Sequence, residues 1–529
     1  MRFGLRTCCA TLGLALLVLQ PSAAAGWGEP AAGRDGVPRA VPSTEKALRV
    51  YLDQRERRFE AIAVAHGRAT WRYFDTADST ELDEVLSRWR RLVLDERLLD
   101  TIAFWGNHAS RLRDPVLRRR VNVWRNVLTW ARVELSDEVQ AHSGPLIRWL
   151  ASGQGAEPTP PRAKIEERML ELMSARNRMA ARLGFHDFGA LVLDVDGTGA
   201  AWLDSLVDSL LESTEERYRL AVRRVAGAEC DPDVATLSRI AWQYEKKLKR
   251  LGAERKDPDH AIREVMGRIG LDVGRRPITL VEREMPRGFG GNGFPVRIPG
   301  DFRIVINKAI GLPFYYRLHE IGHGLHRTST RVAPPVLKGY EWCLGADSPA
   351  WAEGMAETVA GFSVVGPSQD EDGPSGSSGA GPETVDERAV VWLRVKIARA
   401  LFERELYRNP EKTVDDVWSS IVRRILGAAR PEPGSMAIDS LAWVTYPVYE
   451  QNYFLADIVS WQVHEALRER FGAGYATDPR VGGFLVERCW APGASRGWRE
   501  LLTRATGKDL DVDGYLASTI LGPSRGRSR

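Results

Sequence analysis

The sequence predicts a mainly α-helical fold, and three observations support this. The chain has 529 residues, of which 43% are hydrophobic and 27% charged, a composition ordinary for a globular protein with a large core. Apolar residues recur about every 3.6 positions through long charged segments, which is the helical period. Alternating runs of β-branched residues are scarce, and the best strand candidate is 302–306.

The helices are expected from residue 43 onward. Ser43 or Thr44 can cap a first helix, since both side chains accept hydrogen bonds from backbone N–H groups. Leu48, Leu52 and Phe59 then fall on one face of that helix. Further helices are expected at 81–99, 115–134, 162–183 and 202–225, and again from residue 388.

The N-terminus has the layout of a secretory signal peptide at 1–25. Arg2 and Arg6 precede an apolar run at 8–19, and Ala23 to Ala25 offer a small-residue cleavage site. The apolar run is too short to span a bilayer, and the alternative is a buried first helix. The prediction is a secreted or periplasmic protein without a membrane segment after processing.

Charge and cysteines exclude some classes of function. The formal net charge of +4 is small for so long a chain and does not indicate a nucleic-acid partner. Outside the signal peptide the chain holds Cys230, Cys343 and Cys489, which are far apart and form no metal motif. One disulfide is possible in an oxidising compartment, and its pairing is left open.

Residues 319–323 read His-Glu-Ile-Gly-His. On a helix His319 and His323 stand one turn apart on the same face, so their imidazoles can hold one Zn²⁺. Glu320, beside the first histidine, can act as the general base toward a water activated by the metal. The alternative is a chance occurrence of this short pattern on a solvated helix.

A third protein ligand is expected on a second helix that begins near Ser348-Pro349. Glu353 and Glu357 share a face of that helix, four residues apart. Glu353 can complete the zinc site, and Glu357 can accept a hydrogen bond from the free ring nitrogen of a ligating histidine. The alternative is that both glutamates are surface residues on a solvated face.

With these residues in view, the chain resembles the angiotensin-converting-enzyme (peptidyl-dipeptidase A) family of zinc metallopeptidases, the gluzincins. The resemblance extends from about residue 45 to 520 and is densest in a few segments. Those segments are 69–73, 301–304, 349–353 with Glu357, 453–454, 462–467, Trp498 and 506–507.

The resemblance implies a two-lobed helical fold with a deep central cleft and only a minor β element. It implies His319, His323 and Glu353 as ligands of one zinc ion and Glu320 as base. It also implies Tyr453 as the donor that hydrogen-bonds the oxyanion of the tetrahedral intermediate. Core packing is the alternative for Tyr453, and Tyr446 and Tyr449 are nearby competitors for its role.

The chain departs from that family in residues that select substrate and chloride. Asn452 stands where the family has a chloride-site arginine, and no histidine occurs at 441–443. Residues 289–294, where the substrate-pairing strand would fall, are Gly-rich and lack histidine. They can form either a close-approach strand or a hairpin turn. The lysine that grips a C-terminal carboxylate has no counterpart, so substrate-binding residues are left unassigned.

The predicted organisation is a signal peptide at 1–25, a linker at 26–42 and one peptidase domain at 43–522. A mobile low-complexity insertion occupies 366–387, and a basic disordered tail 523–529. The predicted function is an exported zinc peptidase acting on oligopeptides. The alternative is a non-catalytic peptide-binding protein with the same fold. The terminus attacked and the oligomeric state are left open.

Overall fold

The structure is a computed structural model. It describes residues 41–76, 78–151, 161–226, 232–250, 257–284, 291–308, 313–365, 386–428, 431–432, 434, 436, 438 and 441–521.

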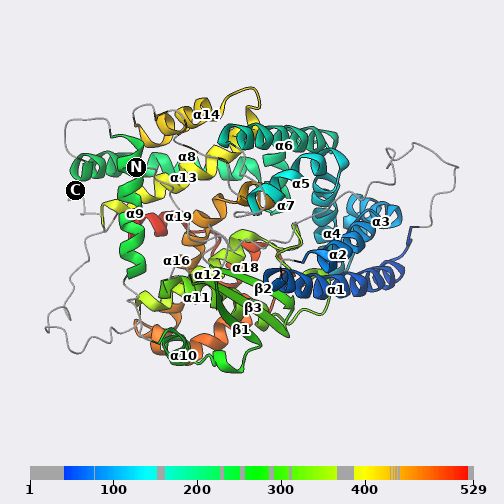
Figure 1. Ribbon diagram of the computed structural model, residues 1–529. Coiled ribbons are helices and arrows are strands. Elements are labelled where there is room, and N and C mark those ends of the chain that lie inside the picture. The colour runs from blue at the N-terminus through cyan, green and yellow to red at the C-terminus, as the bar shows by residue number, and fades with distance from the viewer. Residues whose placement is uncertain are drawn as a thin grey trace.

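Helices dominate these residues (Figure 1). They are α1 (Glu45–Thr76), α2 (Thr80–Val93), α3 (Glu96–Asn107), α4 (Pro115–Glu134), α5 (Asp137–Ala151), α6 (Arg162–Arg182), α7 (Phe188–Val195), α8 (Ala200–Ala226), α9 (Val234–Arg250), α10 (Pro258–Arg268), α11 (Phe314–Ser329), α12 (Pro349–Val365), α13 (Arg388–Arg408), α14 (Val414–Ile421), α15 (Leu441–Thr445), α16 (Gln451–Phe471), α17 (Arg480–Phe484), α18 (Trp498–Thr506) and α19 (Val512–Tyr515).

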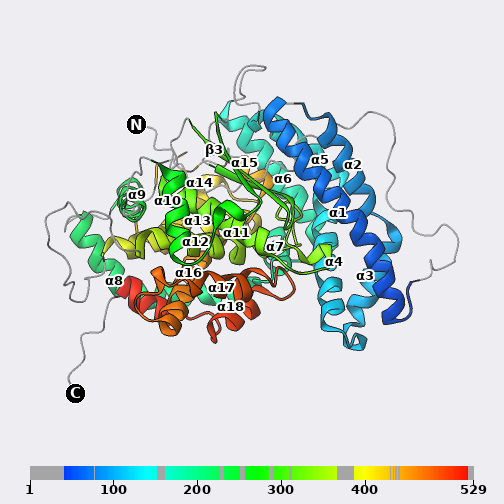
Figure 2. The same ribbon diagram turned by 90° about the horizontal axis from the view of Figure 1, so that it is seen from below.

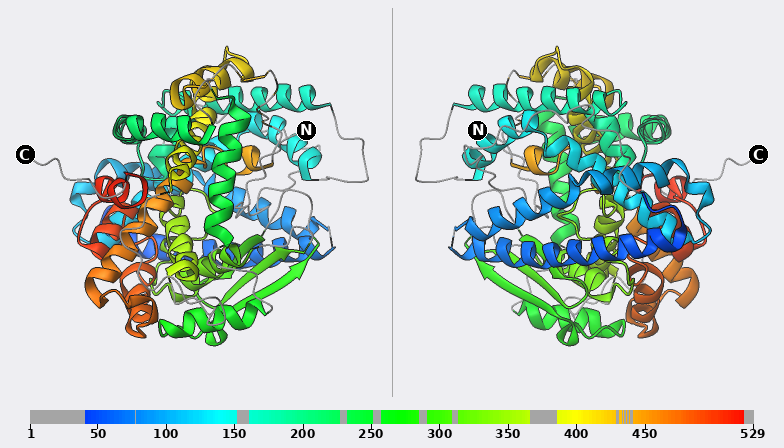
Figure 3. Two further views of the ribbon diagram at one scale, coloured as in Figure 1. Left: turned by 90° about the vertical axis from the view of Figure 1, so that its left-hand side faces the viewer. Right: turned by 90° about the vertical axis from the view of Figure 1, so that its right-hand side faces the viewer.

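One small sheet lies among the helices. It contains β1 (Ile278–Arg283), β2 (Gly291–Arg297) and β3 (Asp301–Asn307) in the order β1-β3-β2. β3 pairs parallel with β1 and antiparallel with β2, so β2 is an edge strand. Helix α1 runs along the sheet and contacts β2 (Figure 3).

The apolar core divides into two clusters. One lies among α1–α8, α13 and α14, and the other joins the sheet to α10, α11, α12 and α18. Helix α16 serves both, with Phe454 and Ile458 in the first cluster and Val459 and Val463 in the second. Figure 2 shows α11, α12, α13 and α16 in the middle of the molecule, with α8 and α9 on one side and α1, α2 and α3 on the other. The prediction of a mainly helical, two-lobed fold with a minor β element is confirmed.

One local expectation was wrong, and one open alternative is decided. The helix expected at 81–99 is broken between α2 and α3, because the Asp95 side chain accepts a hydrogen bond from the Leu98 N–H and caps a new helix. The Gly-rich segment after residue 290 forms the strand β2 and not a hairpin turn. By contrast, α4 has the predicted bounds of 115–134.

The predicted terminal segments, insertion and cysteines have different outcomes. Several predicted segments lie outside the described residues: the signal peptide at 1–25, nearly all of the linker at 26–42, residues 366–385 of the insertion predicted at 366–387, and the tail at 523–529. Cys230 also lies outside them. Within the part of the chain that the structure describes, Cys343 and Cys489 are buried free thiols and are not bonded to each other. Among the described residues, no helix is both long and apolar enough to cross a membrane.

Candidate metal centre

Helix α11 presents the two histidines to the interior of the protein. His319 and His323 are each 1% exposed, and their Nε2 atoms lie 3.2 Å apart. The burial arises because α11 lies between the sheet and α12, with Leu318, Ile321 and Leu325 in the apolar core beside it. The helical spacing read from the sequence therefore places both imidazoles on one buried face.

Helix α12 brings Glu353 to the same point. Its Oε2 atom lies 3.3 Å from His319 Nε2 and 3.9 Å from His323 Nε2, and the side chain is 1% exposed. Ligands at about 2.0–2.1 Å from a tetrahedral Zn²⁺ are separated by roughly 3.4 Å. Two nitrogens and one carboxylate oxygen at these separations fit a zinc site with three protein ligands.

Glycines allow α11, α12 and α16 to approach closely enough to form this site. A Cβ added at Gly322, inside the His-Glu-Ile-Gly-His motif, would lie 2.8 Å from Ala356 Cα on α12. A Cβ added at Gly354 would lie 2.5 Å from Val459 Cγ1 on α16. Real Cβ atoms do not occur at such distances, so both contacts require glycine.

A carboxylate faces the second nitrogen of each imidazole. Glu357 Oε1 lies 3.2 Å from His319 Nδ1, and Glu341 Oε1 lies 3.6 Å from His323 Nδ1. Arg327 holds Glu341 through hydrogen bonds of 3.0 and 2.8 Å. Such partners fix the tautomer and ring orientation of a ligating histidine. Sequence reasoning missed Glu341, which lies in the irregular segment before α12 and has no spacing signal.

The electrostatics of the three candidate ligands are coupled. Burial alone would raise the pKa of Glu353, but His319 and His323 outweigh it and lower the pKa to about 2. Burial opposes protonation of His319, yet Glu353 and Glu357 raise its pKa. Burial lowers the pKa of His323. The site thus holds an anionic carboxylate against two imidazoles, an arrangement that suits a cation.

Glu320 points toward the sheet. Burial, with help from the charges of Glu353 and Glu341, raises its pKa to about 8. A Cβ added at Gly293 of β2 would lie 3.8 Å from Glu320 Oε2, and one at Gly291 would lie 3.4 Å from Oε1. The edge strand therefore places bare backbone beside the carboxylate.

Three tyrosines flank the site from one segment. The Tyr449 hydroxyl donates a 2.7 Å hydrogen bond to Glu353 Oε1. Tyr453, in the first turn of α16, has its ring 5.5 Å from that of Tyr449, and the Tyr446 ring lies 5.7 Å from that of Tyr449. Burial and the Glu353 charge raise the pKa of Tyr449, so its hydroxyl stays protonated. Sequence reasoning named Tyr449 only as a competitor, whereas it directly contacts a candidate ligand.

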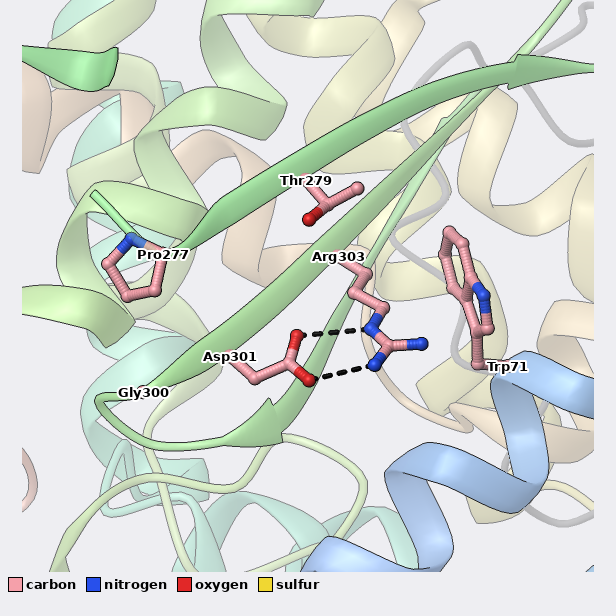
Figure 4. A pocket seen from close by; sticks show the side chains of 6 residues that line it. All are labelled: Trp71, Pro277, Thr279, Gly300, Asp301 and Arg303. Carbon is pink, nitrogen blue, oxygen red and sulfur yellow. Dashed lines mark hydrogen bonds and ion pairs between the residues drawn. The ribbon is translucent and has the colours of Figure 1, made fainter. Parts of the chain in front are cut away.

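Two hollows adjoin the sheet. One lies between α1 and β2 and is lined by residues that include Thr70, Gly293 and Tyr446. The other is shown in Figure 4, where Arg303 makes a bidentate pair with Asp301 at 3.0 and 2.8 Å and Trp71 stands beside it. Side chains alternate along β3, and Phe302 faces the core with α11, so Arg303 points away from the metal centre. This second hollow is separate from the candidate metal centre.

The chain shares its fold with known proteins but not a recognisable sequence. No family model and no curated protein sequence matches the chain. Solved structures do. An M32 carboxypeptidase from Deinococcus radiodurans R1 aligns with a TM-score of 0.57 and 16% identity over 89% of this chain and 97% of that one. A Pyrococcus furiosus carboxypeptidase gives a TM-score of 0.57 and 16% identity, covering 90% and 98% of the two chains. Trypanosoma cruzi metallocarboxypeptidase 1 gives 0.57 and 15%, covering 89% and 97%.

The chain has the fold of these carboxypeptidases. At such identities the likeness establishes the carboxypeptidase fold and not the reaction. It extends over 97–98% of each of these neighbours. The narrower resemblance to the angiotensin-converting-enzyme family stays a prediction.

Proposed function

We propose that the protein is a zinc-dependent peptidase that hydrolyses oligopeptides. The observation that carries this proposal is the buried cluster of His319, His323 and Glu353, with Glu320 alongside and Glu357 behind His319. A non-catalytic binding protein has no physical need for the buried Glu320, whose burial disfavours its charged form. The carboxypeptidase fold agrees with the proposal.

Each residue has a distinct role in the proposed reaction. Zinc, when bound, would supply a Lewis acid that polarises the scissile carbonyl and acidifies water. Glu320 takes a proton from the attacking water and passes it to the leaving amine. Tyr453 hydrogen-bonds the developing oxyanion, a role supported by its place beside Tyr449 in the first turn of α16. Glu357 and Glu341 orient the two imidazoles.

The substrate is proposed to be an extended peptide. β2 is an edge strand, Gly291 and Gly293 lie beside Glu320, and Gly293 lines the hollow between α1 and β2. A peptide can add to such an edge through main-chain hydrogen bonds. The names of the structural neighbours favour attack near a peptide C-terminus. The predicted signal peptide favours an exported enzyme.

Mass spectrometry of a mixed peptide library tests the proposal. We expect wild type to produce fragments whose lengths report the terminus attacked, and Glu320→Gln to bind zinc without producing any. Glu212→Gln, an exposed position on α8, is the matched control and should cleave like wild type. Cleavage by Glu320→Gln would refute the mechanism. Zinc binding without cleavage by wild type would favour the peptide-binding protein.

A further inference from the structure

The turn that presents Tyr449 has an unusual backbone. Val448, just before it, has φ of 57°, the one positive φ at a non-glycine position among the described residues. β-branched residues rarely adopt this region, because Cβ crowds the backbone there. Val448 is also fully buried. A conformation of this kind persists only where its surroundings determine it by several contacts.

Glu403, on α13, supplies the contacts that determine the turn. Its carboxylate accepts hydrogen bonds from the backbone N–H groups of both Val448 and Tyr449. The side chain is 3% exposed, and its Oε1 has no hydrogen-bond partner among the described residues, which leaves Oε2 as the acceptor. The carbonyls are held from the other side: Gln451 Nε2 donates to Val448 O at 2.5 Å, and Asn452 Nδ2 to Tyr449 O at 3.0 Å.

The chain just before the turn is anchored separately. Arg176, on α6, donates to the backbone oxygens of Trp443 at 3.2 Å and Val444 at 2.6 Å. Arg176 is itself fully buried and paired with Glu134 at 2.8 Å. Arg176 therefore holds the backbone just before the turn in place, and Glu403 determines the direction of the chain after the turn.

The direction of the turn has a consequence at the metal centre. The Tyr449 hydroxyl donates to Glu353 Oε1, while Glu353 Oε2 is the atom that faces His319 and His323. A hydrogen bond on Oε1 stabilises charge on that oxygen away from the metal and disfavours ligation by both oxygens. The position of Tyr449 thus selects one carboxylate oxygen as the ligand.

We propose that Glu403 is a positioning residue for the metal centre. By accepting from the amides of Val448 and Tyr449, it holds the Tyr449 hydroxyl on Glu353 and so fixes which carboxylate oxygen faces the metal. The inference rests on the proposed metal-binding function, but it concerns a residue on another helix that touches neither the metal ligands nor substrate.

Three variants separate the hydrogen-bond acceptor of Glu403 from the hydroxyl of Tyr449. Burial raises the pKa of Glu403 to about 8, so the neutral amide of Glu403→Gln is a close mimic and keeps an acceptor. Glu403→Met has similar volume but no carboxyl or amide acceptor. Tyr449→Phe removes only the hydroxyl that reaches Glu353.

Two measurements test the idea on the full chain. The first is the zinc dissociation constant, obtained by competition with a chelator. The second is the visible absorption spectrum of the Co²⁺-substituted protein, which responds to coordination number. We expect Glu403→Gln to match wild type. Glu403→Met and Tyr449→Phe should each weaken zinc binding by ~10–100-fold and change the Co²⁺ spectrum in the same way.

The double variant Glu403→Met/Tyr449→Phe decides between positioning and general stability. If Glu403 acts through Tyr449, the double variant binds zinc no more weakly than Tyr449→Phe alone. Additive losses, or wild-type zinc binding by Glu403→Met, would overturn the inference. Should Glu403→Met fail to fold, Glu403→Asp withdraws the acceptor by one methylene and must reproduce the Tyr449→Phe spectrum. A wild-type protein that binds neither Zn²⁺ nor Co²⁺ would instead refute the proposed function.

Discussion

Replacing Gly322 with alanine tests whether the close approach of α11 and α12 creates the metal site. The added Cβ would lie 2.8 Å from Ala356 Cα, 3.0 Å from Val359 Cβ and 3.1 Å from Ala356 O. All three atoms belong to α12, three to six residues beyond Glu353. Two of them are backbone, so rotation of a side chain cannot make room.

The size of the effect follows from these distances. Ordinary contact begins at 3.4 Å, so α12 must move away from α11 by about 0.6 Å. Overpacking of this kind costs roughly 1–3 kcal/mol of folding stability. A metal site tolerates only about 0.2 Å in its ligand distances. We therefore expect Gly322→Ala to fold with reduced stability and to bind zinc at least ~10-fold more weakly.

Thermal unfolding with and without zinc, together with chelator competition, measures both quantities. Gly267→Ala is the matched control, because a Cβ at this position on α10 would meet no atom within 4 Å. It should leave zinc binding unchanged and stabilise the helix by up to ~1 kcal/mol. If Gly322→Ala binds zinc as tightly as the control does, the close helix contact does not set the ligand geometry.

Three further predictions concern side chains around the site. Tyr453→Phe should lower kcat by ~10²–10³-fold with zinc affinity unchanged; a full turnover rate would remove Tyr453 from the mechanism. Glu341→Ala should weaken zinc binding by ~10–100-fold because His323 loses its carboxylate partner, and equilibrium dialysis that shows no change would argue against that pairing. In the metal-free protein, Glu320 binds its proton more tightly when folded, with a pKa of about 8 against 4.5. The folding stability that this proton contributes is therefore fully present below pH 4.5 and is lost as pH rises through 8. The loss amounts to at most ~5 kcal/mol, at ~1.4 kcal/mol per pKa unit. Urea unfolding should show that the free energy of unfolding falls less between pH 5 and 8 for Glu320→Gln than for wild type. An equal pH dependence in the two proteins would refute the buried, protonated Glu320.

The sequence predicted the parts of the site that obey a local period. His319 and His323 are one helical turn apart, as are Glu353 and Glu357, and the structure places both pairs on facing helices. The rule needs only the helix to form, and α11 and α12 form where the apolar pattern indicated. The same holds for α4, whose bounds follow from Pro115 and a regular apolar face.

The remaining parts depend on tertiary contacts that carry no period. Glu341 lies in the loop between α11 and α12, where Arg327 of α11 binds its carboxylate beside His323. Tyr449 could not be separated from Tyr453 by spacing, since the left-handed turn at Val448 decides where it points. β2 has low strand propensity because it is rich in glycine, and pairing with β3 overrides that preference.

A zinc titration of the metal-free protein tests the central claim most directly. The rate of hydrolysis of a peptide that the wild-type enzyme cleaves is measured as zinc is added. If His319, His323 and Glu353 hold the catalytic ion, activity rises from baseline and levels off at one equivalent of zinc per chain. Full activity before any zinc is added, or none after saturation, would contradict the account.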